Sequence, residues 1–380
     1  MRVALTGATG FLGLRLVREL LERHDSLTVL AHAGSGCALG RITRFLELTD
    51  APDVLIADLP RRLRVVEVDL GRPGLGLTDE AFQRLADELD VIWHSAGNIN
   101  LDDDIGNLRR VNVEGTRRVL ELAAAGGRKP LLHHVGTAFV GGARREGVVY
   151  EDELDSRHGF ENNYERSKYE AEVLVHDWAR AQGRPVVIMR PSILVTDLPP
   201  DPELPQHPLQ FLSRIVRASL RSAGSGNGPT GVPEERRPVV RLAGHPEGHL
   251  NLMPVEHAAA VMVRLASRPP SGRTDVYHVV HDHDVAATVL TALMERIAPV
   301  KVRLVENRPD DPEPLEAAAD LYPGFTPYLS HRRRFDDTRV RTLLGPYTSG
   351  IRVGLDYLTT GTTPTPPPDG NPTLVPARTS

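Results

Sequence analysis

The sequence of 380 residues lacks several features that mark particular classes of protein. Its only cysteine is Cys37, which excludes an internal disulfide and suits a reducing compartment such as the cytoplasm. It has no uninterrupted run of about 18 apolar residues, so no membrane-spanning helix is predicted. Lys and Arg number 45 against 50 Asp and Glu, so the basic excess typical of nucleic-acid binding is missing.

Two further absences concern targeting and metals. No charged stretch followed by an apolar one opens the sequence, so a secretory signal peptide is not expected. The chain has 15 histidines, yet none stands at ligand spacing with carboxylates on a helix face, and no metal is predicted. The histidines closest to one another in the sequence are His133, His134, His281 and His283.

A glycine-rich turn near the first residue is the strongest feature present. It follows an apolar run over 2–5 and precedes apolar residues at helical spacing over 14–22. Glycines between a strand and a helix let the backbone approach a diphosphate, and the helix N-terminus offers N–H groups to its oxygens. The turn therefore predicts dinucleotide binding. Its predicted contacts are Gly7, Thr9, Gly10, Phe11, Leu12 and Gly13.

The end of the second predicted strand, 27–31, bears on the choice of nicotinamide cofactor. An acid there would accept hydrogen bonds from the ribose of NAD, whereas a basic residue would meet the 2′-phosphate of NADP. His32 follows the strand without an Asp or Glu, and Arg41 and Arg44 come soon after. NADPH is therefore favoured over NADH, with His32 and Arg41 as predicted contacts.

Further strands are predicted over 64–68, 91–93, 131–135 and 186–189, alternating with helical patterns that include 78–88, 112–125 and 163–178. This alternation predicts an α/β fold with a Rossmann-type, doubly wound parallel sheet. Residues just after these strands belong at the ligand-binding edge of such a sheet. Asp69 and Leu70 suit the adenine, and small residues after the fourth strand let the ribose approach the backbone. Those small residues are Ser95, Ala96 and Gly97.

The alternation of strands and helices stops near residue 196, which predicts a second, smaller domain. We expect a dinucleotide-binding domain over 1–195, to which 251–280 return, and a substrate-binding domain over 196–250 and 281–360. The segment 198–234 should cover the substrate, and a helix is expected over 251–267. From residue 361 to 380 the chain is rich in Thr and Pro, which predicts a disordered tail.

A catalytic set is predicted from three residues. Tyr164 and Lys168 stand four apart at the start of a helix, so they share one face and the ammonium can lower the pKa of the phenol. Such a tyrosine can give a proton to a carbonyl oxygen, and the lysine can also hold ribose hydroxyls. Thr137, after the fifth strand, can hydrogen-bond the same oxygen. Taken singly, each residue could also be structural.

In combination these motifs resemble those of the extended short-chain dehydrogenases/reductases. The resemblance implies a Ser/Thr-Tyr-Lys set on Thr137, Tyr164 and Lys168, and cofactor contacts at Tyr164, Lys168, Pro191 and Ser192. The residues that carry it are Thr6 to Gly13, His94 to Gly97, Asn112 to Thr116, Thr137, Tyr164, Lys168 and Arg190 to Ser192.

Details over 66–77, 164–172, 251–255 and 328–336 resemble the thioester-reductase and fatty acyl reductase branch of the male sterility type. That branch implies NADPH-dependent reduction of an acyl thioester, on a carrier protein or coenzyme A, to an aldehyde or alcohol. Any carrier protein is expected in trans, and the chain is expected to be a monomer or homodimer. Three positions depart from the branch: His32 replaces an arginine, Gly136 a serine and Gly97 an alanine.

Other functions remain open on the same scaffold. They are a ketone or aldehyde reductase or hydroxyl dehydrogenase, an NAD-dependent sugar epimerase or dehydratase, and a non-enzymatic cofactor-binding module. The three intact catalytic residues argue against the last. A group of arginines could meet a phosphopantetheine arm or an acidic carrier protein. They are Arg214, Arg217, Arg221, Arg236, Arg237 and Arg241.

Overall fold

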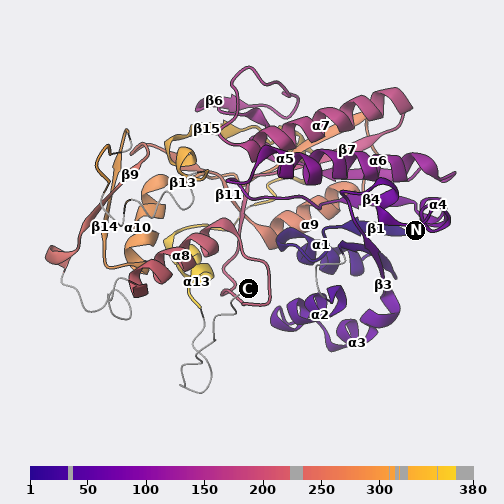
Figure 1. Ribbon diagram of the computed structural model, residues 1–380, viewed down its shortest axis with the longest axis horizontal. Helices are drawn as coiled ribbons and strands as arrows, with labels where there is room; N and C mark the ends of the chain where they lie inside the picture. The colour runs from indigo at the N-terminus through magenta and orange to yellow at the C-terminus, as the bar shows by residue number, and fades with distance from the viewer. Residues whose placement is uncertain are drawn as a thin grey trace.

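A sheet of parallel strands forms the centre of the computed structural model (Figure 1). The model describes residues 1–32, 37–222, 234–307, 309–312, 316, 324–348 and 350–364. Within these residues the sheet has seven strands in the order β12-β7-β5-β4-β1-β2-β3. Their bounds are β1 Val3–Thr6, β2 Leu27–His32, β3 Leu63–Val68, β4 Val91–His94, β5 Leu131–Val135, β7 Val186–Pro191 and β12 Thr274–Val279. The strand order reverses between β1 and β4, and this confirms the predicted Rossmann-type fold.

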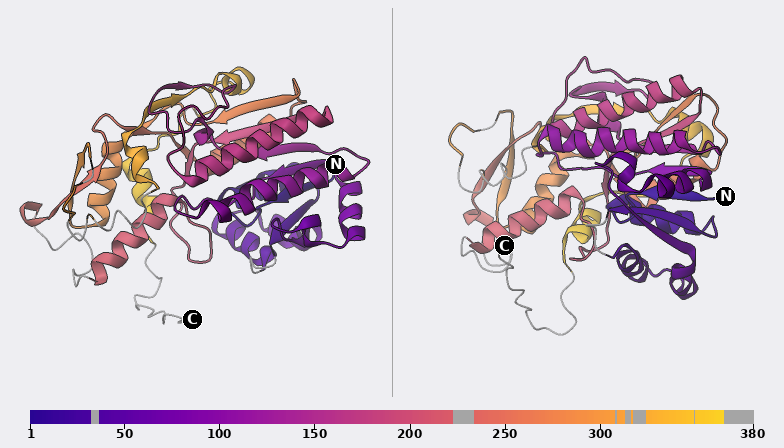
Figure 2. Two further views of the ribbon diagram at one scale, coloured as in Figure 1. Left: turned by 45° about the horizontal axis from the view of Figure 1, so that its top comes forward. Right: turned by 45° about the vertical axis from the view of Figure 1, so that its right-hand side comes forward.

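Helices cover both faces of the sheet, as Figures 1 and 2 show. Successive strand residues face opposite ways: Leu5 packs in the cluster on the α1 side, and Ala4 in the cluster on the α6 side. The first face carries α1 Phe11–Leu21, α2 Ala38–Leu48, α3 Asp53–Arg62, α9 Val255–Ala266 and α12 Thr338–Leu344. The second carries α4 Asp79–Glu88, α6 Gly115–Ala125 and α7 Asn163–Gln182.

Most of the remaining elements gather beside the carboxyl ends of the strands. Residues of β8, β10, β11, β13, α8, α10 and α13 share a third apolar cluster, and β9 and β14 contribute to a fourth. Short strand pairs join distant segments there: β8 with β11, β9 with β14, β10 with β13, and β6 with β15. The strands are β6 Glu146–Val149, β8 Ile193–Val195, β9 Val239–Ala243, β10 His249–Leu250, β11 Leu252–Pro254, β13 Val285–Ala286, β14 Lys301–Val305 and β15 Arg332–Phe335. The helices are α5 Ile105–Leu108, α8 Pro208–Ser222, α10 Ala287–Ile297 and α13 Leu355–Thr362.

Two predicted helices begin differently in the structure. The pattern over 112–125 starts as a π-helical turn, Arg109–Glu114, and only then continues as α6. The pattern over 251–267 starts as a strand, β11, which pairs with β8, and α9 begins after Pro254. Proline lacks an N–H and disfavours helical geometry in the residue before it, so Met253 stays extended.

The predicted tail begins too early. Gly361 and Thr362 lie in α13 and are buried, and a Cβ on Gly361 would come within 1.9 Å of the Thr196 carbonyl oxygen. Residues 365–380 of the predicted tail lie outside the described residues, as do residues 223–233 of the segment expected to cover the substrate. The division into two domains stays a prediction. The described helices include none long and apolar enough to cross a membrane.

Candidate active site

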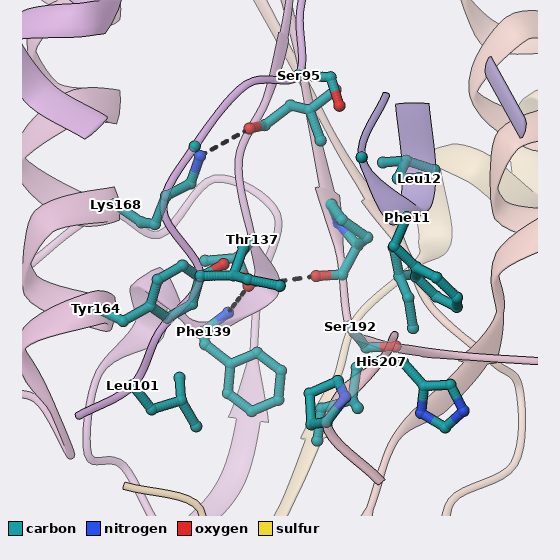
Figure 3. Close-up of a pocket in the computed structure, with 18 of the residues that line it drawn as sticks. Phe11, Leu12, Ser95, Leu101, Thr137, Phe139, Tyr164, Lys168, Ser192 and His207 are labelled. Atoms are coloured by element: carbon teal, nitrogen blue, oxygen red, sulfur yellow. Dashed lines mark hydrogen bonds between the residues drawn. The ribbon is translucent and has the colours of Figure 1, made fainter. Parts of the chain in front are cut away.

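A cavity of about 360 Å³ lies at the carboxyl ends of β1, β4, β5 and β7 (Figure 3). It brings together most of the predicted residues, from five separate stretches of sequence. Those that line it are Gly7, Gly10, Phe11, Leu12, Gly13, Ser95, Gly97, Thr137, Tyr164, Lys168, Pro191 and Ser192. The sheet edge therefore places the predicted catalytic set and the glycine turn against the same space.

Six predicted cofactor contacts do not line this cavity. They are Thr9, His32, Arg41, Asp69, Leu70 and Ala96. His32 is the last residue of β2, and Asp69 directly follows β3. The adenosine half of a dinucleotide binds at the ends of these two strands in this fold. Asp69 accepts the Gly71 N–H on its carboxylate at 2.8 Å, which fixes the turn after β3. The cavity thus corresponds to the other half of the cofactor site.

The glycine turn has the shape that a dinucleotide requires. Gly7 has φ +72°, and a Cβ there would lie 2.7 Å from the Ala96 nitrogen. A Cβ on Gly13 would lie 1.8 Å from the Gly7 carbonyl oxygen. Side chains are excluded at both positions, so the start of α1 opens directly onto the cavity and its first N–H groups can meet an anion. These residues fit a dinucleotide diphosphate.

A buried hydrogen-bond chain holds the strand ends beneath the cavity. The Thr6 hydroxyl accepts the N–H groups of Ser95 and Ala96 at 3.2 and 3.1 Å, so its own proton goes to Nδ1 of His94 at 2.9 Å. His94 Nε2 then donates to Thr116 Oγ1 at 3.0 Å. Burial, with Lys168 nearby, lowers the pKa of His94 to about 3, so the ring is neutral. The backbone N–H groups of Ser95 and Ala96 are thus already occupied.

Helix α7 positions Tyr164 and Lys168. Asn162 caps its first turn by accepting the Glu165 N–H at 3.0 Å. Tyr164 and Lys168 then face the cavity from one side of the helix (Figure 3). Ser167 lies between them, and its hydroxyl donates to the Tyr164 carbonyl oxygen at 2.8 Å.

Lys168 is a buried cation at the cavity wall. Its Nζ donates to the Val135 carbonyl oxygen at 2.9 Å. Burial lowers the pKa of its ammonium to about 8, against an opposing effect of Glu172. The group is therefore protonated near neutral pH and close to titrating, which suits a cation that stabilises a phenolate.

Thr137 has both a structural contact and a free path to the cavity. Its hydroxyl accepts the Phe139 N–H at 3.3 Å and donates to the Pro191 carbonyl oxygen at 3.4 Å. It thereby caps the short helix Ala138–Gly141. Figure 3 shows the residue beside the ring of Tyr164, so a rotation of the weakly held hydroxyl proton would direct it to a ligand oxygen.

An ion pair beneath the site accounts for the unexpected Gly136. Glu172 on α7 pairs with Arg190 on β7 at 2.6 Å, and both side chains are almost fully buried. A Cβ on Gly136 would come within 2.9 Å of the Glu172 carboxylate. Burial alone would raise the pKa of Glu172, but Arg190 and the other partners hold it at about 2. The glycine leaves room for this pair directly beneath Thr137.

The cavity also has apolar lining residues that the sequence did not reveal. These are Ile99, Leu101, Phe139, Ile193, Leu194, Phe325 and Tyr328. They come from loops and short elements spread over more than half of the chain, with no shared motif. His207 also lines the cavity, near the start of α8. Residues 205–208 of the segment 198–234 line the same cavity. That this segment covers the substrate stays a prediction.

Among the described residues, His281, Asp282 and His283 form a group close enough to hold an ion. His281 Nδ1, however, accepts the His283 N–H at 3.0 Å, and its Nε2 lies 3.1 Å from the Ile351 carbonyl oxygen. Both ring nitrogens already serve the backbone. The absence of a metal stays a prediction.

A family profile described as male sterility protein, with an NAD-binding domain, matches residues 5–262 of the chain. The chain belongs to the male sterility protein family. This confirms the predicted resemblance, and with it an extended short-chain dehydrogenase/reductase scaffold. Members of this family are NAD(P)-dependent oxidoreductases, and NAD(P) is the cofactor class of the chain.

Proteins of similar sequence are much longer than this chain. The chain is 31% identical over 278 residues to an isonitrile lipopeptide synthase of Streptomyces coeruleorubidus, covering 71% of the chain and 17% of that relative. It is 30% identical over 301 residues to a carboxylic acid reductase of Mycobacterium tuberculosis, covering 74% of the chain and 24% of the relative. The chain thus spans a quarter or less of these relatives.

A solved structure of similar fold covers most of the chain. It is the terminal R domain from the myxalamid PKS-NRPS biosynthetic pathway, with 27% identity and a TM-score of 0.71. The match covers 94% of this chain and 88% of that domain.

Proposed function

We propose that the chain is an NADPH-dependent reductase of acyl thioesters, taking its acyl group from a carrier protein or coenzyme A. One observation carries this proposal: the glycine turn, Thr137, Tyr164 and Lys168 line a single cavity together with a set of apolar side chains. Kinship to a carboxylic acid reductase and to a lipopeptide synthase supports a thioester as the substrate class.

Within this proposal each catalytic residue has a role. When bound, the dinucleotide supplies the hydride for the thioester carbonyl carbon. Tyr164 would give its phenolic proton to the carbonyl oxygen as negative charge develops there, and the Thr137 hydroxyl would donate a second hydrogen bond. The Lys168 ammonium would favour the phenolate that remains. The hydroxyl of the resulting hemithioacetal then returns its proton to the Tyr164 phenolate as the C–S bond breaks. The sulfur leaves as a thiolate, and an aldehyde is released or reduced again.

The proposal of NADPH rather than NADH rests on the end of β2. No acid stands there to accept hydrogen bonds from a ribose, and His32 is exposed. Arg41 lies in the first turn of α2, close behind. Arg44, by contrast, pairs with Asp201 at 3.0 Å and is committed to that contact.

The decisive experiment follows the oxidation of NADPH and NADH by absorbance, first with an acyl-CoA and then with the matching aldehyde. We expect turnover of the thioester with NADPH, and a loss of at least about a hundredfold in Tyr164→Phe. Tyr169→Phe is the matched control, because Tyr169 is on the same helix but packs against Phe160, with ring centroids 5.2 Å apart. Turnover of the aldehyde alone would identify a carbonyl reductase, and binding without turnover an epimerase or a binding module.

A carrier protein would meet basic residues on α8. Arg214 is exposed there, and Arg217 Nε donates to Ser213 Oγ at 3.3 Å. Arg241 instead pairs with Glu316 at 2.8 Å, and the Arg221 side chain lies outside the described part of the chain. The double change Arg214→Glu and Arg217→Glu should raise the KM for an acyl carrier protein and leave the KM for acyl-pantetheine unchanged.

The exposed Arg303 on β14 offers a matched control for that test. Arg303→Glu reverses one positive charge, as each of the two changes on α8 does, but it does so on β14. Equal effects of both changes on the carrier substrate would reject a specific role for α8.

A further inference from the structure

His207 is a buried imidazole that the proposed mechanism does not use. Its side chain is 1% exposed and lines the cavity, in the view of Figure 3 on the same side as Phe11 and Ser192. Neither ring nitrogen has a hydrogen-bond partner among the described residues, nor does Oε1 of the adjacent Gln206. A buried polar group without a partner costs about 1–3 kcal/mol, so such groups need an explanation. A ligand in the cavity would supply the missing partner.

The surroundings of His207 favour an anion. Pro208 follows it as the first residue of α8, a helix of 15 residues whose first N–H groups have no partner inside the helix. The imidazole lies beside Phe11, with ring centroids 5.5 Å apart, and Phe11 is the first residue of α1. The starts of two helices therefore border one space. The Arg15 guanidinium lies 4.5 Å from the centroid of the Phe11 ring but is paired with Glu256 at 2.9 Å, so the two helix starts rather than Arg15 favour the anion.

The position of His207 within the cavity selects one part of the dinucleotide. The cavity includes Thr137 and Pro191 at the reacting end but neither Asp69 nor His32 at the adenosine end. An anion between the two helix starts is thus on the nicotinamide side of the diphosphate. Burial and Arg15 lower the pKa of the imidazole to about 3, so it is neutral at neutral pH and still carries one N–H to donate.

We propose that His207 donates a hydrogen bond to the nicotinamide-side phosphate of the bound dinucleotide, opposite the glycine turn. The segment 205–208 then closes the cofactor site as well as bordering the substrate space. This inference rests on cofactor binding alone, so it does not require that the substrate be a thioester.

The test is the dissociation constant for NADPH, compared with that for 2′,5′-ADP, which lacks the nicotinamide-side phosphate. His207→Phe keeps a ring against Phe11 but removes the N–H, and it should weaken NADPH binding roughly tenfold. Binding of 2′,5′-ADP should change less than about twofold. His207→Gln retains an N–H donor and should keep NADPH affinity within about threefold. Calorimetry or protein fluorescence gives these constants without any substrate.

His133 provides the matched control, because it too is buried with both ring nitrogens unpartnered among the described residues, but it does not line the cavity. His133→Leu should leave both affinities unchanged.

Unchanged NADPH binding in His207→Phe would overturn the inference, as would an equal weakening of both ligands. If His207→Phe does not fold, His207→Ala is measured in its place against the same two ligands. A wild-type chain that binds NADPH but reduces no thioester would refute the proposed function and leave this inference standing.

Discussion

At the scale of single residues, Lys168 links the chemistry to pH. Its buried ammonium has a pKa lowered to about 8, so it loses its proton as the pH rises through that value. Below about pH 8 the Lys168 cation stabilises the phenolate of Tyr164, and above that pH the neutral amine no longer does so. We expect kcat for thioester reduction to fall as the pH rises through about 8. Stopped-flow rates across pH 6 to 10, an interval of about two units on each side of this pKa, provide the measurement.

Lys168→Arg is the control for this pH profile. A guanidinium does not titrate in this range, so the fall near pH 8 should vanish even though the absolute rate is lower. A profile that still falls near pH 8 in the variant would assign the titration to another group.

Gly13 is the residue on which the cofactor turn depends most directly. A Cβ there would lie 1.8 Å from the Gly7 carbonyl oxygen, so Gly13→Ala must displace the backbone. We expect a cost of at least about 1–3 kcal/mol in unfolding free energy, together with a large loss of NADPH affinity. Thermal unfolding and NADPH titration measure the two effects.

The comparison variant is Gly127→Ala, since nothing lies within 4 Å of a Cβ at Gly127. It should change neither quantity appreciably. NADPH affinity retained in Gly13→Ala would contradict the role assigned to the turn.

At the scale of elements, the ion pair of Glu172 and Arg190 fastens the catalytic helix α7 to strand β7. Arg190 also donates to the Glu153 carbonyl oxygen at 3.1 Å, so the guanidinium is well satisfied. Glu172→Gln leaves a buried positive charge without its partner, which should cost about 3–5 kcal/mol in urea unfolding. Replacing both residues by methionine should cost less than this single change.

The contribution of Glu172 depends on pH in a defined direction. Its pKa is about 2 in the folded protein, below the usual 4.5. The stabilisation is therefore fully present above about pH 4.5 and is lost as the pH falls toward 2. The difference in unfolding free energy between wild type and Glu172→Gln should shrink over that interval. A constant difference down to low pH would show that Glu172 is not held ionised by Arg190.

At the scale of the whole molecule, local patterns predict one part of the site and not the other. The glycine turn and the Tyr164–Lys168 pair are each encoded within seven residues or fewer, because their geometry follows from the spacing of nearby residues. The alternation of strands and helices fixes the parallel sheet, and hence the edge at which Thr137 meets them. The cavity walls are different: Phe139, His207 and Tyr328 meet only through tertiary packing.

The same long-range packing explains the misplaced start of the tail. The composition after residue 361 suggests no buried structure, yet Gln210 Nε2 donates to the Gly361 carbonyl oxygen at 2.7 Å across 151 residues. Ser213 Oγ likewise donates to the Thr362 carbonyl oxygen at 3.2 Å. No sequence window that covers one of these segments includes its partner, so composition alone could not predict their burial.

Helix α13 thus packs against α8, next to the segment proposed to close the cofactor site, and its removal tests that link. Its Leu358 is fully buried, a contact worth about 1.5–3 kcal/mol, and its last turn holds Gln210 near the start of α8. A chain ending at Gly354 should unfold at lower temperature and bind NADPH more weakly, since the segment that carries His207 loses its anchor. A chain ending at Pro364 retains every one of these contacts and should match the full chain in both measurements. If instead the shorter chain kept full NADPH affinity while losing only stability, α13 would support the fold without supporting the cofactor site.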